Sequence, residues 1–169
     1  MVDIFKYCPR CGKPAIQTTS PKVINCRKCA FRFYLTAYPT AGAILTNRSG
    51  EILLVERKNE PKKGYWDIPG GFVELNENLE TAIVRELKEE LGADIHGLTY
   101  IGSSTDVYPY KGVTYKTITA VYTASISAKI YPADDVASYR YFNVKNFPTK
   151  RFAFPGLARL VLKFLGNHR

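Results

Sequence analysis

Three glutamates near the middle of the sequence have the spacing of one helix face. Glu86, Glu89 and Glu90 stand at positions i, i+3 and i+4, so their carboxylates would gather on one side of a helix. Like charges at this spacing weaken a helix by roughly a few tenths of a kcal/mol per pair, and acids near its C-terminal end oppose its dipole. A hard divalent cation such as Mg²⁺ or Mn²⁺ would offset both effects, because it prefers carboxylate oxygens. The alternative is a solvated acidic face with Arg85 and Lys88 as partners.

The four cysteines form a second cluster of candidate ligands. Cys8 and Cys11 make one pair, Cys26 and Cys29 make another, and fourteen residues separate the pairs. Two tight turns that each present two thiolates can close a tetrahedral Zn²⁺ site, and four protein ligands leave no position open for a substrate. We therefore expect a structural zinc, which would replace the core that so short a segment cannot build. Two disulfides are the alternative, and the reducing cytosol disfavours them.

The glutamates belong to a longer pattern of fixed residues. It runs from Gly71 through Glu77 to the stretch Arg85–Gly92, whose sequence is Arg-Glu-Leu-Lys-Glu-Glu-Leu-Gly. This pattern resembles the Nudix box, the loop–helix–loop signature of the Nudix hydrolases. Every fixed position is matched, and the one departure is Ala93, where the family usually has a larger aliphatic residue. That departure concerns packing after the helix rather than chemistry.

The resemblance implies a role for each charged residue of the pattern. The three glutamates match the family's ligands for Mg²⁺ or Mn²⁺, and a backbone carbonyl of the Gly70–Gly71 segment is often added. Arg85 matches a residue that holds the glutamates by charge-assisted hydrogen bonds, and Glu77 matches one that supports the outer shell of the metal. The predicted catalytic metal site therefore comprises Gly70, Glu86, Glu89 and Glu90.

The general base has more than one candidate. In this family a carboxylate from a downstream loop often acts as base or extra ligand, but no glutamate follows Glu90 in this sequence. Asp135 stands six residues before Tyr141, much as a glutamate precedes an aromatic residue in related enzymes, and is the candidate on that ground. Glu89 is the alternative base, and a surface-turn role for Asp135 stays open.

A zinc ribbon joined directly to a Nudix domain is similar to the C-terminal part of the NADH pyrophosphatase subfamily. That subfamily carries a Ser-Gln-Pro-Trp-Pro-Phe-Pro-type motif after the box, whereas residues 103–109 here are Ser-Ser-Thr-Asp-Val-Tyr-Pro. The missing Trp and prolines argue against assigning NADH or NAD-capped RNA. The resemblance implies a metal-dependent hydrolase that cleaves the diphosphate of a nucleoside diphosphate linked to another moiety, with ADP-ribose or an NADH-like dinucleotide favoured.

Other functions stay open. The basic ribbon and tail suggest an RNA-end or cap hydrolase, and tyrosines after the box suggest a dinucleoside polyphosphate hydrolase. A non-catalytic nucleotide- or RNA-binding module is less favoured, since a lost activity would leave no reason to keep repelling acids together. Aromatic residues that could stack on a base, or equally pack in a core, are Phe31, Tyr108 and Tyr110.

Charge and hydropathy limit the partners and the compartment. The net charge is +9, and the segment before Thr36 holds seven bases against Asp3 alone. A basic body around an acidic patch suits an anionic ligand that arrives with a cation, and simple solubility is the equal alternative. We expect a nucleotide-type small molecule as the partner, with nucleic acid less favoured and a homodimer left open. A membrane span needs about 20 apolar residues, and no such run occurs. Because Met1–Cys8 also lacks a secretory signal, we expect a cytoplasmic protein.

An α+β fold must position these residues. Leu79, Ile83, Leu87 and Leu91 recur every four residues, which predicts a helix over 78–91, and Pro155 opens a last helix. The resemblance implies a Nudix α/β/α sandwich with a mixed sheet, preceded by a small zinc ribbon. The expected domains are residues 1–36 and 37–169, with strands at 30–39, 94–106, 113–126 and 138–144 and a hairpin of 41–46 with 51–56.

Overall fold

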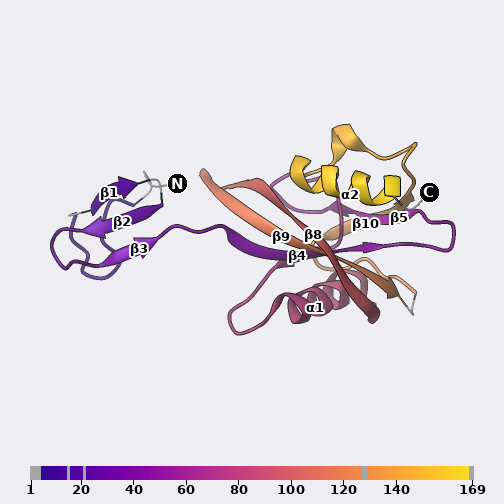
Figure 1. The fold of residues 1–169 in the computed structure, drawn as a ribbon, viewed down its shortest axis with the longest axis horizontal. Helices are drawn as coiled ribbons and strands as arrows, with labels where there is room; N and C mark the ends of the chain where they lie inside the picture. The colour runs from indigo at the N-terminus through magenta and orange to yellow at the C-terminus, as the bar shows by residue number, and fades with distance from the viewer. Residues whose placement is uncertain (1–4, 15, 21, 127–128, 168–169) are drawn as a thin grey trace.

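A small antiparallel sheet forms the first part of the chain in this computed structural model, which describes residues 5–14, 16–20, 22–126 and 129–167. Its strand order is β1 (Ile16–Ser20), β2 (Val23–Cys26) and β3 (Arg32–Tyr34). This sheet and its turns, the ribbon, lie at one end of the molecule, and residues 35–37 join them to the larger body (Figure 1). The strand expected at 30–39 is thus interrupted by this connection.

The body is built on a four-stranded mixed sheet. Its order is β7 (Gly70–Phe72), β4 (Tyr38–Leu45), β9 (Val113–Ile126) and β8 (Ile95–Tyr110). β4 and β9 run parallel, and the other two pairs are antiparallel. β8 and β9 form a long hairpin whose tip extends toward the ribbon end of the molecule (Figure 1).

A second sheet has the order β10 (Val136–Phe142), β5 (Ile52–Arg57) and β6 (Trp66–Asp67). The predicted hairpin of 41–46 with 51–56 is therefore wrong, because β4 and β5 enter different sheets and share only the bridge Thr46↔Ile52. The turn residues Asn47–Gly50 predict that the chain reverses direction there, but they do not determine which strands then pair. Both strands are buried along most of their length, so each packs between layers.

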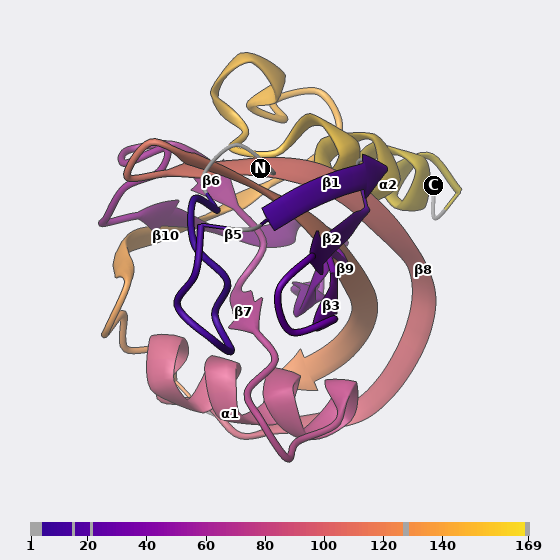
Figure 2. The same cartoon turned by 90° about the vertical axis from the view of Figure 1, so that its left-hand side faces the viewer.

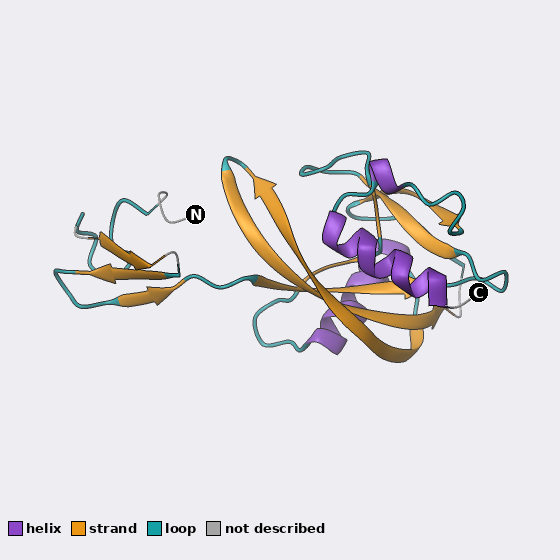
Figure 3. Ribbon diagram, turned by 45° about the horizontal axis from the view of Figure 1, so that its top comes forward, coloured by secondary structure: helices purple, strands orange, loops and turns teal. Residues whose placement is uncertain are grey.

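The two helices cover opposite sides of these sheets (Figure 3). α1 (Leu79–Leu91) packs on a core that includes Leu53 and Tyr122, and α2 (Pro155–Asn167) packs on a second core that includes Val121. A short 3₁₀ helix, Thr149–Arg151, precedes α2. This arrangement around a mixed sheet confirms the predicted fold class. Neither described α-helix is long and apolar enough to cross a membrane.

Both ends of α1 are fixed by local contacts. The Asn78 side chain accepts from the Thr81 amide at 2.8 Å, and the Thr81 hydroxyl accepts from the Asn78 amide at 3.0 Å, which forms a capping box. Gly92 ends the helix with φ 63°, and its amide donates to the Lys88 carbonyl at 3.0 Å. The predicted helix is confirmed, and its two caps set the register of the acidic face before any ligand binds.

Candidate active site

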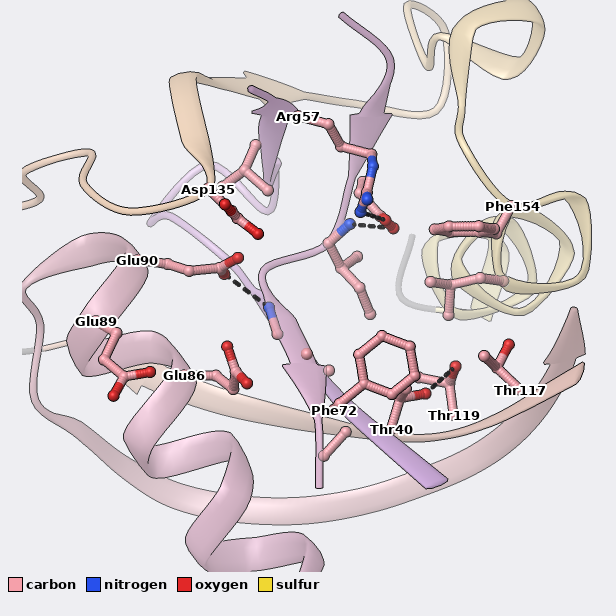
Figure 4. A pocket seen from close by; sticks show the side chains of 18 of the residues that line it. Thr40, Arg57, Phe72, Glu86, Glu89, Glu90, Thr117, Thr119, Asp135 and Phe154 are labelled. Atoms are coloured by element: carbon pink, nitrogen blue, oxygen red, sulfur yellow. Dashed lines mark hydrogen bonds and ion pairs between the residues drawn. The ribbon is translucent and has the colours of Figure 1, made fainter. Parts of the chain in front are cut away.

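A cavity of about 340 Å³ lies between the C-terminal half of α1, strand β7 and the strands β5 and β9 (Figure 4). Its acidic side is formed by α1, which places the three predicted glutamates along one wall. Its other side is aromatic. The lining includes Arg57, Asp67, Gly70, Gly71, Phe72, Arg85, Glu86, Glu89, Glu90, Tyr108, Asp134, Asp135 and Phe154.

Arg85 connects the acids of this wall. Its guanidinium donates to both oxygens of Glu77, at 2.7 and 3.2 Å, and to Glu86 and Glu89 at 2.9 Å each. It also donates to the Phe72 carbonyl at 3.0 Å. The hydrogen bonds from Arg85 lower the pKa of Glu77. In turn Glu77, Glu86 and Glu89 raise the pKa of Arg85. The structure therefore brings Glu77 and Arg85 to the glutamates in one charge-assisted network.

Two glycines allow the backbone of β7 to approach the acids closely. The Gly70 amide donates to Glu90 at 2.8 Å. A Cβ on Gly70 would overlap the carbonyl oxygen of Ala41, and its φ of 137° lies in the region that favours glycine. A Cβ on Gly71 would lie 2.5 Å from the carboxylate of Glu86. Glycine is thus required at Gly70 by backbone contacts, whereas at Gly71 a side chain would displace the carboxylate of Glu86.

Burial raises the pKa of several acids in the cavity. Glu90 is only 7% exposed, and desolvation raises its pKa to about 8, assisted by the charges of Glu86 and Asp67. Burial also raises the pKa of Glu86. Burial raises the pKa of Asp67 to about 7, although Arg57 at 3.4 Å opposes the shift. An additional positive charge in the cavity would therefore favour the ionised forms of these acids.

The carboxylates of α1 have the donor chemistry of a site for a hard divalent cation, because three of them line one cavity. Their hydrogen bonds nevertheless go to protein groups: Arg85 holds Glu86 and Glu89, and the Gly70 amide holds Glu90. In the part of the chain that the structure describes, the four cysteines are the only group of three or more candidate ligands whose atoms all lie within 4.8 Å.

The other predicted site residues lie at different places. Asp135 and Tyr108 line the cavity, and the Asp135 carboxylate accepts from the side-chain Nδ2 of Asn59 at 2.5 Å. Tyr110 lines an outer cavity that adjoins the first and shares Tyr108 and Asp135 with it. Phe31 lies in the ribbon and lines neither of these cavities.

Sequence reasoning missed most of the aromatic side of the cavity. Tyr108 lies nearly parallel to Phe154, with ring centroids 5.9 Å apart and an interplanar angle of 20°. It also contacts Phe72 edge to face at 5.3 Å, and the Arg57 guanidinium lies 5.3 Å from the centroid of Phe154. Phe72 could have been noticed beside the Gly-Gly pair. Phe154 and Arg57 carry no local signal, since only the tertiary fold brings them to Tyr108.

Asp106 is a further residue that the sequence did not single out. Its buried carboxylate accepts from the amides of Gly156 at 2.8 Å and Leu157 at 2.9 Å, and from the Ser104 hydroxyl at 2.9 Å. A Cβ on Gly156 would lie 2.6 Å from this carboxylate. An anion at the start of α2 also interacts favourably with the helix dipole. Asp106 thereby ties α2 to β8 and fixes the chain just after Phe154.

The cysteines converge in the ribbon. The sulfur atoms of Cys8 and Cys29 lie 3.7 Å apart, as do those of Cys11 and Cys26, and all four thiols are free. The four ligand atoms lie within 4.8 Å of one another. The backbone of Cys29 lowers the pKa of Cys26. A backbone hydrogen bond at Phe31 lowers the pKa of Cys29, but desolvation and the neighbouring thiols outweigh it and raise that pKa, so a bound cation would favour having all four as thiolates. The cluster can therefore bind a metal ion, and the disulfide alternative is not what the structure shows.

Known proteins resemble this chain in sequence and in fold. The model of the NUDIX domain family matches residues 37–163. An ADP-ribose pyrophosphatase of Methanocaldococcus jannaschii is 35% identical over 137 residues, which are 79% of this chain and 78% of that protein. A NAD-capped RNA hydrolase of Haemophilus influenzae is 34% identical over 106 residues, which are 62% of this chain but only 40% of that protein.

Solved structures show the same fold. A NUDIX hydrolase from Nitrosomonas europaea superposes with a TM-score of 0.74 at 23% identity, and the superposition covers 97% of this chain and 92% of that chain. A bifunctional NMN adenylyltransferase/ADP ribose pyrophosphatase from Francisella tularensis superposes with a TM-score of 0.59 at 25% identity, over 80% of this chain and 42% of that one.

Proposed function

The chain belongs to the NUDIX domain family, and we propose that it hydrolyses the diphosphate of ADP-ribose or of an NADH-like dinucleotide. One observation supports a diphosphate-linked nucleotide as the substrate. A single cavity joins an acidic wall, suited to a metal-bound diphosphate, to an aromatic wall that could stack on a base. The similarity to an ADP-ribose pyrophosphatase, which extends over most of both proteins, points the same way.

Glu86, Glu89 and Glu90 are our proposed ligands for Mg²⁺ or Mn²⁺, with the Gly70 carbonyl as a further donor. A bound cation would neutralise phosphate charge and lower the pKa of the attacking water. The raised pKa values of Glu86 and Glu90 support the assignment, because these acids gain most from a nearby positive charge.

The remaining charged residues position this wall. In our proposal Arg85 and Glu77 hold the glutamates in place, which fixes the geometry at the reacting phosphorus. Glu89 is the proposed base, since 48% of its side-chain surface is exposed and it can exchange a proton with water. Asp135 borders the same cavity and is the second candidate for that role.

In our proposal the aromatic residues of the cavity bind the ring of the substrate's nucleobase or nicotinamide. We assign Tyr108, with Phe72 and Phe154, to a stacking surface for the adenine or nicotinamide ring. Tyr110 borders the outer cavity and is proposed to contact the distal part of the substrate. Phe31 does not belong to this assignment, because it lies in the ribbon.

We infer that residues 1–36 form a ribbon held by a structural Zn²⁺ and that residues 37–169 form the hydrolase domain. Four thiolates fit Zn²⁺ better than Mg²⁺, because the softer cation prefers sulfur. The family match, which begins at residue 37, supports the boundary.

Hydrolysis of a substrate panel tests the proposal. ADP-ribose, NADH, diadenosine polyphosphates and capped RNA would each be incubated with Mg²⁺ or Mn²⁺, and the products separated. We expect ADP-ribose or NADH to be cleaved to mononucleotide products. Glu90→Gln should abolish turnover, whereas Glu80→Gln, a matched change on the same helix but outside the cavity, should not.

The outcomes separate the candidate functions. Turnover restricted to capped RNA would favour the RNA-end hydrolase, which the basic ribbon supports as the second candidate. Nucleotide binding with no cleavage of any substrate would show a non-catalytic module. Unchanged turnover in Glu90→Gln would refute the proposed metal site.

A further inference from the structure

The ribbon carries a dense positive charge that its own contacts leave unneutralised. Residues 1–36 hold seven bases against Asp3 alone. Lys22 apart, none of these bases takes part in an ion pair within the described ranges. The exposed bases without an ion pair are Lys6, Arg10, Lys13, Arg27, Lys28 and Arg32.

Aromatic rings lie among these charges on β3, the edge strand of the ribbon sheet. Tyr34 is 58% exposed and Phe33 is 39% exposed. The Arg32 guanidinium donates to the Asn25 side chain at 3.0 Å and to the Tyr34 hydroxyl at 3.5 Å, so it lies beside that ring. Phe33 lies on the other face of β3, where its ring packs against those of Phe5 and Phe31, with centroids 6.0 and 6.5 Å away. Solubility alone would explain the bases but not exposed rings among them.

The ribbon is attached next to the active-site cavity. Thr40 lines that cavity and pairs with Phe72 of β7, and only six positions separate it from Tyr34. Six residues span at most about 22 Å when fully extended. Viewed from the ribbon end, the ribbon lies in front of the body and of β7, whose residues line the cavity (Figure 2). A chain bound to the ribbon could therefore continue into the cavity.

We propose that the ribbon binds a single-stranded polynucleotide through a patch made of Arg27, Lys28, Arg32 and Tyr34. The Arg and Lys side chains pair with backbone phosphates, and the exposed Tyr34 ring stacks on a nucleobase. A single strand fits better than a duplex, because only unpaired bases can present their faces to aromatic side chains. The site of hydrolysis is separate, so binding at this patch does not require an intact acidic wall.

The inference adds to the proposed function without depending on it. If the cavity cleaves a diphosphate-linked nucleotide, the ribbon would hold the strand attached to that nucleotide. Free ADP-ribose carries no such strand, so its hydrolysis should not respond to changes in the patch. The two proposals can therefore fail independently.

Fluorescence anisotropy with a labelled, unstructured and uncapped RNA tests the patch in the zinc-loaded full chain. Tyr34→Ala should weaken binding about 5- to 150-fold through lost stacking. Arg27→Gln with Lys28→Gln should reduce the slope of log K against log salt by about 1.4, the value for two phosphate contacts on a single strand. Lys145→Gln with Lys150→Gln removes the same charge from exposed positions of the body and should change binding little.

Zinc content and ADP-ribose hydrolysis, measured on the same samples, must stay unchanged in the ribbon variants. Equal affinity for RNA and DNA would indicate a general single-strand site, and a preference for RNA would indicate contacts to the 2′-hydroxyl; both support the proposal. Equal affinity for a duplex, wild-type binding by the ribbon variants, or an equal loss in the body variant would overturn it. So would a dimer that Tyr34→Ala dissociates with no change in RNA affinity.

Discussion

Asp106→Asn should loosen the start of α2 and disturb the aromatic wall. The substitution preserves shape, but it removes the charge that faces the helix N-terminus and replaces one acceptor oxygen by a donor. The Asp106 carboxylate accepts hydrogen bonds from the amides of Gly156 and Leu157, and the variant loses one of these two bonds and the interaction with the helix dipole. The two losses together should lower the free energy of unfolding by about 2–4 kcal/mol. Because Phe154 directly precedes α2, we also expect a higher KM for ADP-ribose with a smaller change in kcat.

Urea denaturation and steady-state kinetics measure the two effects separately. Asp94→Asn is a matched control, because its ion pair with Lys88 is exposed and should contribute at most about 1 kcal/mol. Equal stability of Asp106→Asn and the control would refute the assignment of Asp106 as the residue that fixes α2. A lower stability with an unchanged KM would refute the link to Phe154.

Three further predictions address the acids and the ribbon. The folded-state pKa of Glu90 is raised to about 8 from an ordinary 4.5, so without added divalent cation the free energy of unfolding should fall as pH rises between these two values. Urea titrations at several pH values should show a flatter fall for Glu90→Gln. An equal pH dependence of stability in the two proteins would contradict the prediction. Gly71→Ala should lower kcat/KM by on the order of 10²-fold with little loss of stability, because the new methyl displaces only the flexible end of Glu86; wild-type kinetics would count against the contact. Cys26→Ser should remove zinc, as measured by metal analysis, and full retention would exclude Cys26 as a ligand.

The sequence predicted the parts of the site that are local in the chain. The helix that carries Glu86, Glu89 and Glu90 has its own periodicity, its capping box and its left-handed end, and these signals require no tertiary contact. The cysteine cluster was equally accessible, since two short turns determine it. Strand pairing was not: the turn after β4 predicted a hairpin, whereas burial on both faces sent β4 and β5 into separate sheets.

The residues that the sequence did not reveal are those whose roles depend on distant contacts. Phe154 reaches Tyr108 across forty-six positions of sequence, and Asp106 reaches Gly156 across fifty. An aspartate in a strand or a phenylalanine before a helix has many uses in a protein, so residue type and spacing alone could not assign either one.

Binding of Mn²⁺ to the acidic wall tests the central claim most directly. Paramagnetic resonance of free Mn²⁺ would be followed as zinc-loaded wild-type protein, or the double variant Glu86→Gln with Glu90→Gln, is added. We predict that the wild type removes the free-ion signal in a saturable manner, that the double variant does not, and that ADP-ribose hydrolysis depends on the same bound ion. Equal Mn²⁺ binding by the two proteins would contradict the account.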